Sequence, residues 1–140
     1  MPQSLRGRTS SMRSIHHVNF VVRNLEASLP AWEELLGQPV TSRDELPARG
    51  AKIARFRLAN AWLVLIEPTR PDTPPGRHLA EHGEGFFLLS FGVDSLADEA
   101  SRLGEDWFAT PVRSGLDGWR VRDLEPARTA GAQCQLTEEP

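Results

Sequence analysis

The chain repeats itself at an offset of 71 residues, and this repeat limits what it can fold into. His17–Ala27 reads HVNFVVRNLEA, and Leu88–Asp98 reads LLSFGVDSLAD. Each copy is an apolar stretch, a polar helix cap and a helical pattern that later ends in Leu-Gly. The same offset relates Trp62–Ile66 to Gln133–Thr137. Two copies of one supersecondary unit predict an α+β fold in which two pseudo-symmetric modules form a shared cleft.

Composition limits the class of protein. The 140 residues are 39% hydrophobic and 25% charged with a net charge of −3, which is ordinary for one globular domain. The arginines are scattered, so nothing indicates nucleic-acid binding. No apolar run approaches the length of a membrane span. The single cysteine, Cys134, excludes an internal disulfide and favours a reducing, cytoplasmic location.

The chain divides into a tail and one domain. Residues 1–13 are polar and are expected to form a flexible N-terminal tail. Residues 14–140 are expected to form a single domain, with module one at 14–68 and module two at 85–138. The Pro- and Gly-rich linker 69–84 contains a possible helical turn, and it is either a connector or a lid.

Both modules are predicted to run strand, helix, strand, strand, strand. The first helix is expected to begin after Asn24 and to end at Gly37, with Pro30 disturbing its first turns. The second is expected at 95–104. Strands are expected at 15–22, 39–46, 51–58 and 62–67, and again at 86–93, 107–112, 118–123 and 132–137.

Three segments carry a resemblance to a known family. They are Ile15–Val18 (IHHV), Leu63–Pro68 (LVLIEP) and His82–Phe86 (HGEGF). In this order and spacing they resemble the vicinal oxygen chelate superfamily, which includes glyoxalase I, methylmalonyl-CoA epimerase, extradiol dioxygenases and bleomycin-resistance proteins. They look most like the epimerase branch. The resemblance implies two modules that each build half of a cleft, and a homodimer.

The resemblance also implies four metal-ligand positions, which fall here on His17, Val64, Leu88 and Gln135. The repeat agrees, because the same offset relates His17 to Leu88 and Val64 to Gln135. Valine and leucine offer no lone pair, and His17 with Gln135 gives too few ligands for a tight divalent site. We therefore expect no metal of the usual type and no cofactor.

Strand alternation places a set of residues around the predicted cleft. We expect His17 and Gln135 to be catalytic, with substrate-binding residues around them. The substrate-binding set is Asn19, Val64, Ile66, Leu88, Ser90 and Gln133. Neutral amides in an apolar pocket suit a small organic ligand that carries carbonyl or hydroxyl groups.

Other polar residues are assigned weaker roles. Glu67 and His16 alternate away from the cleft face and are expected to be structural. His78 and His82 have a spacing that could place two ligands on one helical face, but they lack a zinc pattern. Two arginine pairs could bind an anion, although a solvated face is the simpler interpretation; these pairs are Arg55 with Arg57 and Arg120 with Arg122.

Two classes of function remain open. The first is a metal-independent isomerase, epimerase or cyclase, of the isomerase or lyase class, that uses His17 for acid–base chemistry. The second is a non-catalytic protein that sequesters a drug or metabolite, as the resemblance to bleomycin-resistance proteins implies. A metal enzyme with non-standard ligands is a third. A cleft histidine beside amides is more than a trap needs, so we favour an enzyme.

Overall fold

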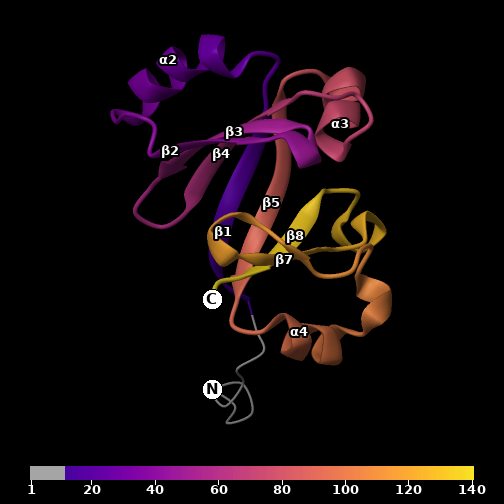
Figure 1. Cartoon of the computed structure of the whole chain (residues 1–140). Helices are drawn as coiled ribbons and strands as arrows, with labels where there is room; N and C mark the ends of the chain where they lie inside the picture. The colour runs from indigo at the N-terminus through magenta and orange to yellow at the C-terminus, as the bar shows by residue number, and fades with distance from the viewer. Residues whose placement is uncertain (1–11) are drawn as a thin grey trace. The chain divides into compact units, whose positions relative to one another are not determined.

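The computed structural model describes residues 12–140, which fall into two compact units (Figure 1). The N-terminal unit is His17–Phe87, and the C-terminal unit joins Leu88–Pro140 to the chain up to His16. Each unit repeats the order strand, helix, strand, strand, strand, which confirms the predicted α+β class. Most of the predicted tail lies outside the described residues, but Met12 and Arg13 belong to a strand.

The N-terminal unit is a four-stranded sheet with two helices. Its strand order is β2-β3-β4-β1, with β1 parallel to β4 and the other neighbours antiparallel. The strands are β1 (Met12–Val21), β2 (Ser42–Leu46), β3 (Ala51–Arg57) and β4 (Trp62–Pro68), and the helices are α2 (Leu25–Leu36) and α3 (Pro74–His82). Helix α3 occupies much of the predicted linker and extends the helical turn expected there.

Helix α2 begins and ends where its sequence signals predict. The side chain of Asn24 accepts a hydrogen bond from the Ala27 amide at 2.9 Å, as an N-cap does. Gly37 ends the helix in the left-handed region at φ 70°. Pro30 lies inside the helix and does not delay its start.

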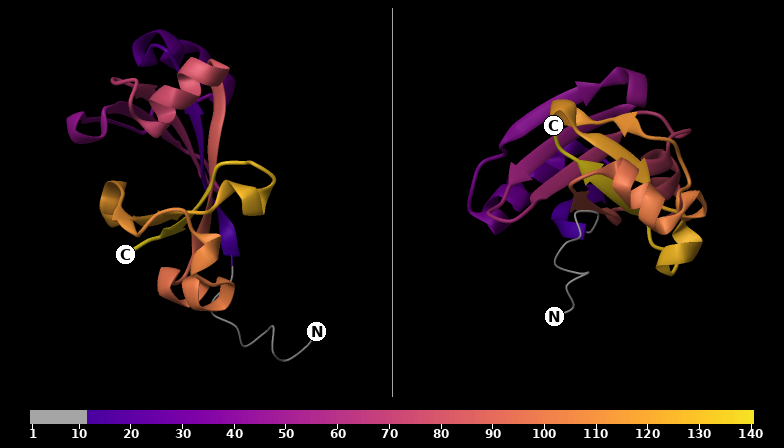
Figure 2. Two further views of the ribbon diagram at one scale, coloured as in Figure 1. Left: turned by 90° about the vertical axis from the view of Figure 1, so that its right-hand side faces the viewer. Right: turned by 90° about the horizontal axis from the view of Figure 1, so that it is seen from below.

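One face of this sheet packs against α2 and forms the core of the unit (Figure 1 and Figure 2). Leu25 and Leu29 supply the helix side of that core. The buried core residues are Val22, Leu25, Leu29, Ala54, Phe56 and Leu65. Side chains alternate along a strand, so the neighbouring positions Arg55, Val64 and Asn19 project from the opposite face.

The C-terminal unit repeats this arrangement. Its strand order is β5-β8-β7-β6, with β5 parallel to β8. Its elements are β5 (Gly85–Val93), α4 (Leu96–Leu103), β6 (Arg113–Ser114), β7 (Arg120–Asp123) and β8 (Cys134–Glu138). Helix α4 lies on one face of β8 and β7 (Figure 1 and Figure 2). Its core is Val93, Leu96, Leu124, Cys134 and Leu136.

The strand predicted at 107–112 is wrong. The segment begins in a 3₁₀ turn (Glu105–Trp107), and only Phe108 makes an isolated bridge, to Leu124. Pro111 has no amide hydrogen to donate to a ladder, so regular pairing starts after it, at β6. No helix within residues 12–140 has the length and apolarity that a membrane crossing requires.

Candidate functional site

In the N-terminal unit, a row of residues crosses the sheet on the face opposite α2. Backbone register pairs Ser42 with Arg55, Arg55 with Val64, and Val64 with Asn19. Register partners share a face, so these four side chains line up across four strands. The predicted residues Asn19 and Val64 are therefore immediate neighbours, and both are buried.

The next rows on this face complete its lining. His17 pairs with Trp62 and is 5% exposed, while Ile66 pairs with Val21 and Ile53. The guanidinium carbons of Arg55 and Arg57 lie 4.8 and 5.3 Å from the centre of the Trp62 ring. The four predicted residues of module one thus share one face with an aromatic ring and two cations.

Arg55 is buried, so it does not lie on the solvated face that was the simpler interpretation. Its side chain is 5% exposed, its Nε donates to Ser42 Oγ at 3.0 Å, and its Nη2 lies 3.8 Å from Asp44 Oδ2. Arg57 is exposed. Arg55 therefore presents a guanidinium on this face, with the carboxylate of Asp44 beside it.

Two oxygens on this face are buried without hydrogen bonds. They are Asn19 Oδ1 and Asp44 Oδ2, neither of which has a hydrogen-bond partner among the described residues, although Asp44 Oδ2 faces Arg55 Nη2 at 3.8 Å. Asp44 pairs with Ile53, so it lies on the same face as Asn19 at the far side of the sheet. Buried polar atoms nearly always make hydrogen bonds, so the unsatisfied oxygen of Asn19 indicates a place where a ligand could donate one.

The C-terminal unit presents a matching row. Register pairs Ser90 with Gln135 and Gln135 with Asp123. Gln135 is 5% exposed, and its Nε2 donates to Asp123 Oδ1 at 3.1 Å. Asp123 is held in turn by both terminal nitrogens of Arg113, at 2.8 and 3.2 Å. This chain of contacts orients the amide and leaves Gln135 Oε1 buried and unpaired within residues 12–140.

The other predicted site residues of this unit differ in burial and in hydrogen bonding. Leu88 is buried on β5. Ser90 is fully buried, and its hydroxyl shares a 2.6 Å hydrogen bond with Thr137. Gln133 is exposed and precedes β8, so it does not share the buried position of Gln135. That the residue sets of the two units line one cleft stays a prediction.

A family model decides the identity of the chain. The model described as the Glyoxalase/Bleomycin resistance protein/Dioxygenase superfamily matches residues 16–122. The chain belongs to this superfamily. The match spans both units, and it confirms the resemblance that the three sequence segments predicted.

The chain is also similar to one curated protein and to solved structures of methylmalonyl-CoA epimerases. The curated Bacillus subtilis protein YqjC, whose function is uncharacterized, is 23% identical over 91% of this chain and 93% of its own. A Streptomyces coelicolor methylmalonyl-CoA epimerase variant in complex with 2-nitronate-propionyl-CoA is 24% identical, covering 92% of this chain and 99% of its own, with a TM-score of 0.83. The Mycobacterium tuberculosis methylmalonyl-CoA epimerase is 20% identical over 95% and 92%, with a TM-score of 0.84. At these identities the structural likeness establishes the fold.

The donor atoms of this superfamily member do not fit the metal site that the family resemblance implies. Val64 and Leu88 are buried aliphatic side chains at two of the four ligand positions. Within residues 12–140, no three His, Cys, Asp or Glu side chains are grouped so as to hold a metal ion. His78 and His82 contact each other instead, with ring centroids 4.6 Å apart. We therefore derive no step through a metal.

Sequence reasoning missed Asp44 and undervalued Arg55. Asp44 lies in the charged segment SRDEL, which has no apolar periodicity. Its side chain could be assigned to the site face only from its register with Ile53 of β3. His16 was correctly separated from the site. Its Nε2 is 2.8 Å from Glu139 Oε2, and its ring packs edge-on against Trp119.

Proposed function

We propose that this superfamily member is a metal-independent isomerase, epimerase or cyclase that acts on a small organic molecule with an acidic C–H next to a carbonyl group. The observation that carries the proposal is the buried oxygen of Asn19, which has no hydrogen-bond partner among the described residues and lies on the same face as His17 and Arg55. An amide oxygen in such a position accepts a hydrogen bond from a ligand hydroxyl, enol or amide group. A ligand over this face that carries such a donor would satisfy Asn19, and Gln135 Oε1 offers an equivalent acceptor in the C-terminal unit.

His17 is the proposed acid–base residue. Its neutral imidazole takes the proton from the carbon beside the carbonyl, and the electron pair of that C–H bond moves to the carbonyl oxygen as an enolate. The imidazolium then returns a proton to carbon. The guanidinium of Arg55, buried on the same face, favours the negative charge that develops on the substrate.

Asp44 lies on the same face as His17 but not close enough to act on the same carbon. It is on β2, three strands away from β1, which separates the two backbones by about 14 Å across a flat sheet. Register offsets them further, because His17 lies in the row of Trp62 and Arg57, whereas Asp44 pairs with Ile53, four residues along β3. We infer that Asp44 positions the guanidinium of Arg55, whose Nη2 lies 3.8 Å from Asp44 Oδ2.

Solvent deuterium exchange tests this function directly. We propose incubating chelator-treated protein in D₂O with small 2-substituted acyl thioesters, starting with methylmalonyl-CoA because structural relatives include methylmalonyl-CoA epimerases. Loss of the C–H signal by NMR would report enolisation. His17→Gln is expected to slow exchange on the order of 10²–10⁴-fold. His82→Gln, an exposed histidine outside the site, is the matched control.

The outcomes separate the two classes of function. Exchange that depends on His17 supports the enzyme, and a smaller loss in Asp44→Asn supports the role of Asp44 in positioning Arg55. Full exchange in His17→Gln would remove His17 from the mechanism. Tight binding by calorimetry with no exchange for any ligand in the panel would contradict catalysis and favour a sequestering protein. A cytoplasmic location belongs to the same proposal.

A further inference from the structure

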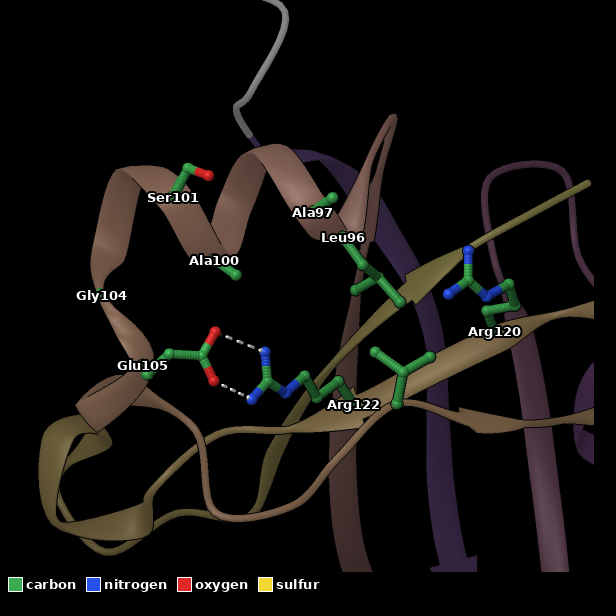
Figure 3. Close-up of a pocket in the computed structure, with 9 residues that line it drawn as sticks. Leu96, Ala97, Ala100, Ser101, Gly104, Glu105, Arg120 and Arg122 are labelled. Carbon is green, nitrogen blue, oxygen red and sulfur yellow. Dashed lines mark hydrogen bonds and ion pairs between the residues drawn. The ribbon is translucent and has the colours of Figure 1, made fainter.

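The C-terminal unit has a surface pocket of about 550 Å³ between α4 and β7 (Figure 3). It lies on a different face from the site described above. Arg122 pairs with Leu136, a core residue under α4, whereas Gln135 alternates to the other face of β8. The pocket is lined by Leu96, Ala97, Ala100, Ser101, Gly104, Glu105, Val112, Arg120 and Arg122.

The two walls of the pocket differ in chemistry. Helix α4 contributes small or apolar side chains, among them Ala97 and Ala100, and Val112 adds an aliphatic side chain that is 37% exposed. Strand β7 contributes two arginines (Figure 3). An apolar wall facing a cationic one suits an amphipathic anion.

Arg122 is already arranged as a carboxylate receptor. Its Nε donates to the Thr110 carbonyl at 2.7 Å, and its guanidinium carbon lies 4.1 Å from the centre of the Phe108 ring. Its two terminal nitrogens donate to the two carboxylate oxygens of Glu105 at 3.2 and 2.5 Å (Figure 3). The backbone and ring contacts hold the guanidinium in place, while Glu105 occupies its bidentate face.

Glu105 is a solvent-exposed occupant of a largely buried receptor. Its side chain is 73% exposed and that of Arg122 is 13% exposed, so Glu105 can swing into water and leave the guanidinium to another carboxylate, which would make the same two hydrogen bonds. The hydrogen bonds from Arg122 lower the pKa of Glu105, so this carboxylate is ionised at neutral pH. Arg120 adds a second cation that is 57% exposed, at 3.5 Å from Glu138.

We propose that this pocket binds a small aliphatic monocarboxylate, which displaces Glu105 from Arg122 and lays its chain along Ala97, Ala100 and Val112. The carboxylate of the ligand takes over the two hydrogen bonds that Glu105 makes. The site is independent of the proposed acid–base function, because none of its residues belongs to that set.

Titration with hexanoate, followed by ¹⁵N-correlated NMR spectra of the whole chain, tests the proposal. We expect shifts at Ala97, Ala100, Ser101 and Val112 with a Kd on the order of 1 mM. Hexylamine, which has the same chain and the opposite charge, should leave these signals in place. Glu105→Ala should tighten hexanoate binding roughly two- to fivefold, since the competing carboxylate is removed.

Two further variants test whether the effect is specific to Glu105 and to the guanidinium of Arg122. Glu81→Ala removes a carboxylate of similar exposure from α3 and should not change hexanoate affinity. Arg122→Lys keeps the charge but loses the bidentate geometry, so it should weaken binding about five- to tenfold. The proposal is overturned if hexanoate shifts the NMR signals of other residues or of none, or if Glu81→Ala tightens binding as much as Glu105→Ala does. It is also overturned if Arg122→Lys gives the NMR spectrum of a folded protein and binds hexanoate with the affinity of the parent.

Discussion

The carboxylate of Glu67, at the end of β4, accepts a hydrogen bond from the backbone amide of Leu25 at 2.7 Å. The same contact occurs 71 residues later, where Glu138 at the end of β8 accepts from the Leu96 amide at 2.7 Å. In both units a strand-end glutamate therefore caps the first free amide of the helix. The sequence repeat corresponds to a repeated hydrogen bond, and the structural role predicted for Glu67 is confirmed.

Glu67→Ala should lower the free energy of unfolding by about 1–3 kcal/mol, because a helix-terminal amide loses a charged acceptor. Glu67→Gln keeps an acceptor and should cost less. Urea denaturation measures both effects. Glu34→Ala, at an exposed position of α2, is the control and should stay within about 0.5 kcal/mol of the parent. Equal effects for Glu67→Ala and Glu34→Ala would contradict the capping role.

Asp123→Ala should release the side-chain amide of Gln135, because it removes the acceptor 3.1 Å from Nε2. The Gln135 side-chain NH₂ signals should then move toward the positions of a free amide. The NH₂ signals of Gln38, which donates to the Arg57 carbonyl, give an internal control that should not move. Asp94→Ala is the matched control variant: it breaks the Arg13–Asp94 ion pair and should leave the Gln135 NH₂ signals in place. Unmoved Gln135 signals in Asp123→Ala would contradict this positioning.

Purified protein should carry well under one equivalent of divalent metal, and a chelator should leave its Tm unchanged. The reason is the pair of aliphatic side chains, Val64 and Leu88, at two ligand positions. Elemental analysis and a thermal melt with EDTA check this. Stoichiometric zinc, nickel, iron or manganese would contradict it.

The ion pair between Glu105 and Arg122 should make a pH-dependent contribution to stability. The pKa of Glu105 is lowered in the folded protein by hydrogen bonds from Arg122. The contribution is therefore present above the pKa of the unfolded chain and is lost as the pH falls through the lowered value. The urea midpoint of Arg122→Gln should approach that of the parent in acid, and NMR titration should show a higher Glu105 pKa in the variant. An unchanged Glu105 pKa would contradict the pairing.

A homodimer of roughly twice the 15.6 kDa chain mass remains our prediction for assembly. Sheets with open edges tend to be covered by another chain. The β2 edge carries Arg43, Asp44 and Glu45, and such charges discourage indiscriminate edge pairing. Light scattering at micromolar concentration measures the mass, and a monomer would count against the prediction.

The sequence by itself determined the order of elements and the faces of the strands. The repeat established two modules of strand, helix, strand, strand, strand, because one local pattern of apolar periodicity and caps recurs at a constant offset. Alternation placed Asn19 on the face of His17 and Ser90 on the face of Leu88, since a period of two decides which face a side chain takes, and the register then puts Asn19 beside Val64 and Ser90 beside Gln135. It also separated His16 from His17.

Only the tertiary structure decided which of these side chains are buried and what they contact. Arg55 looked like a surface residue, yet register with Ser42 and the ring of Trp62 bury it. Asp44 and Asp123 acquire their places through partners on neighbouring strands, and Gln133 falls just outside β8. These contacts join residues distant in the chain, and local periodicity carries no information on which distant groups meet or which acceptors stay unpaired.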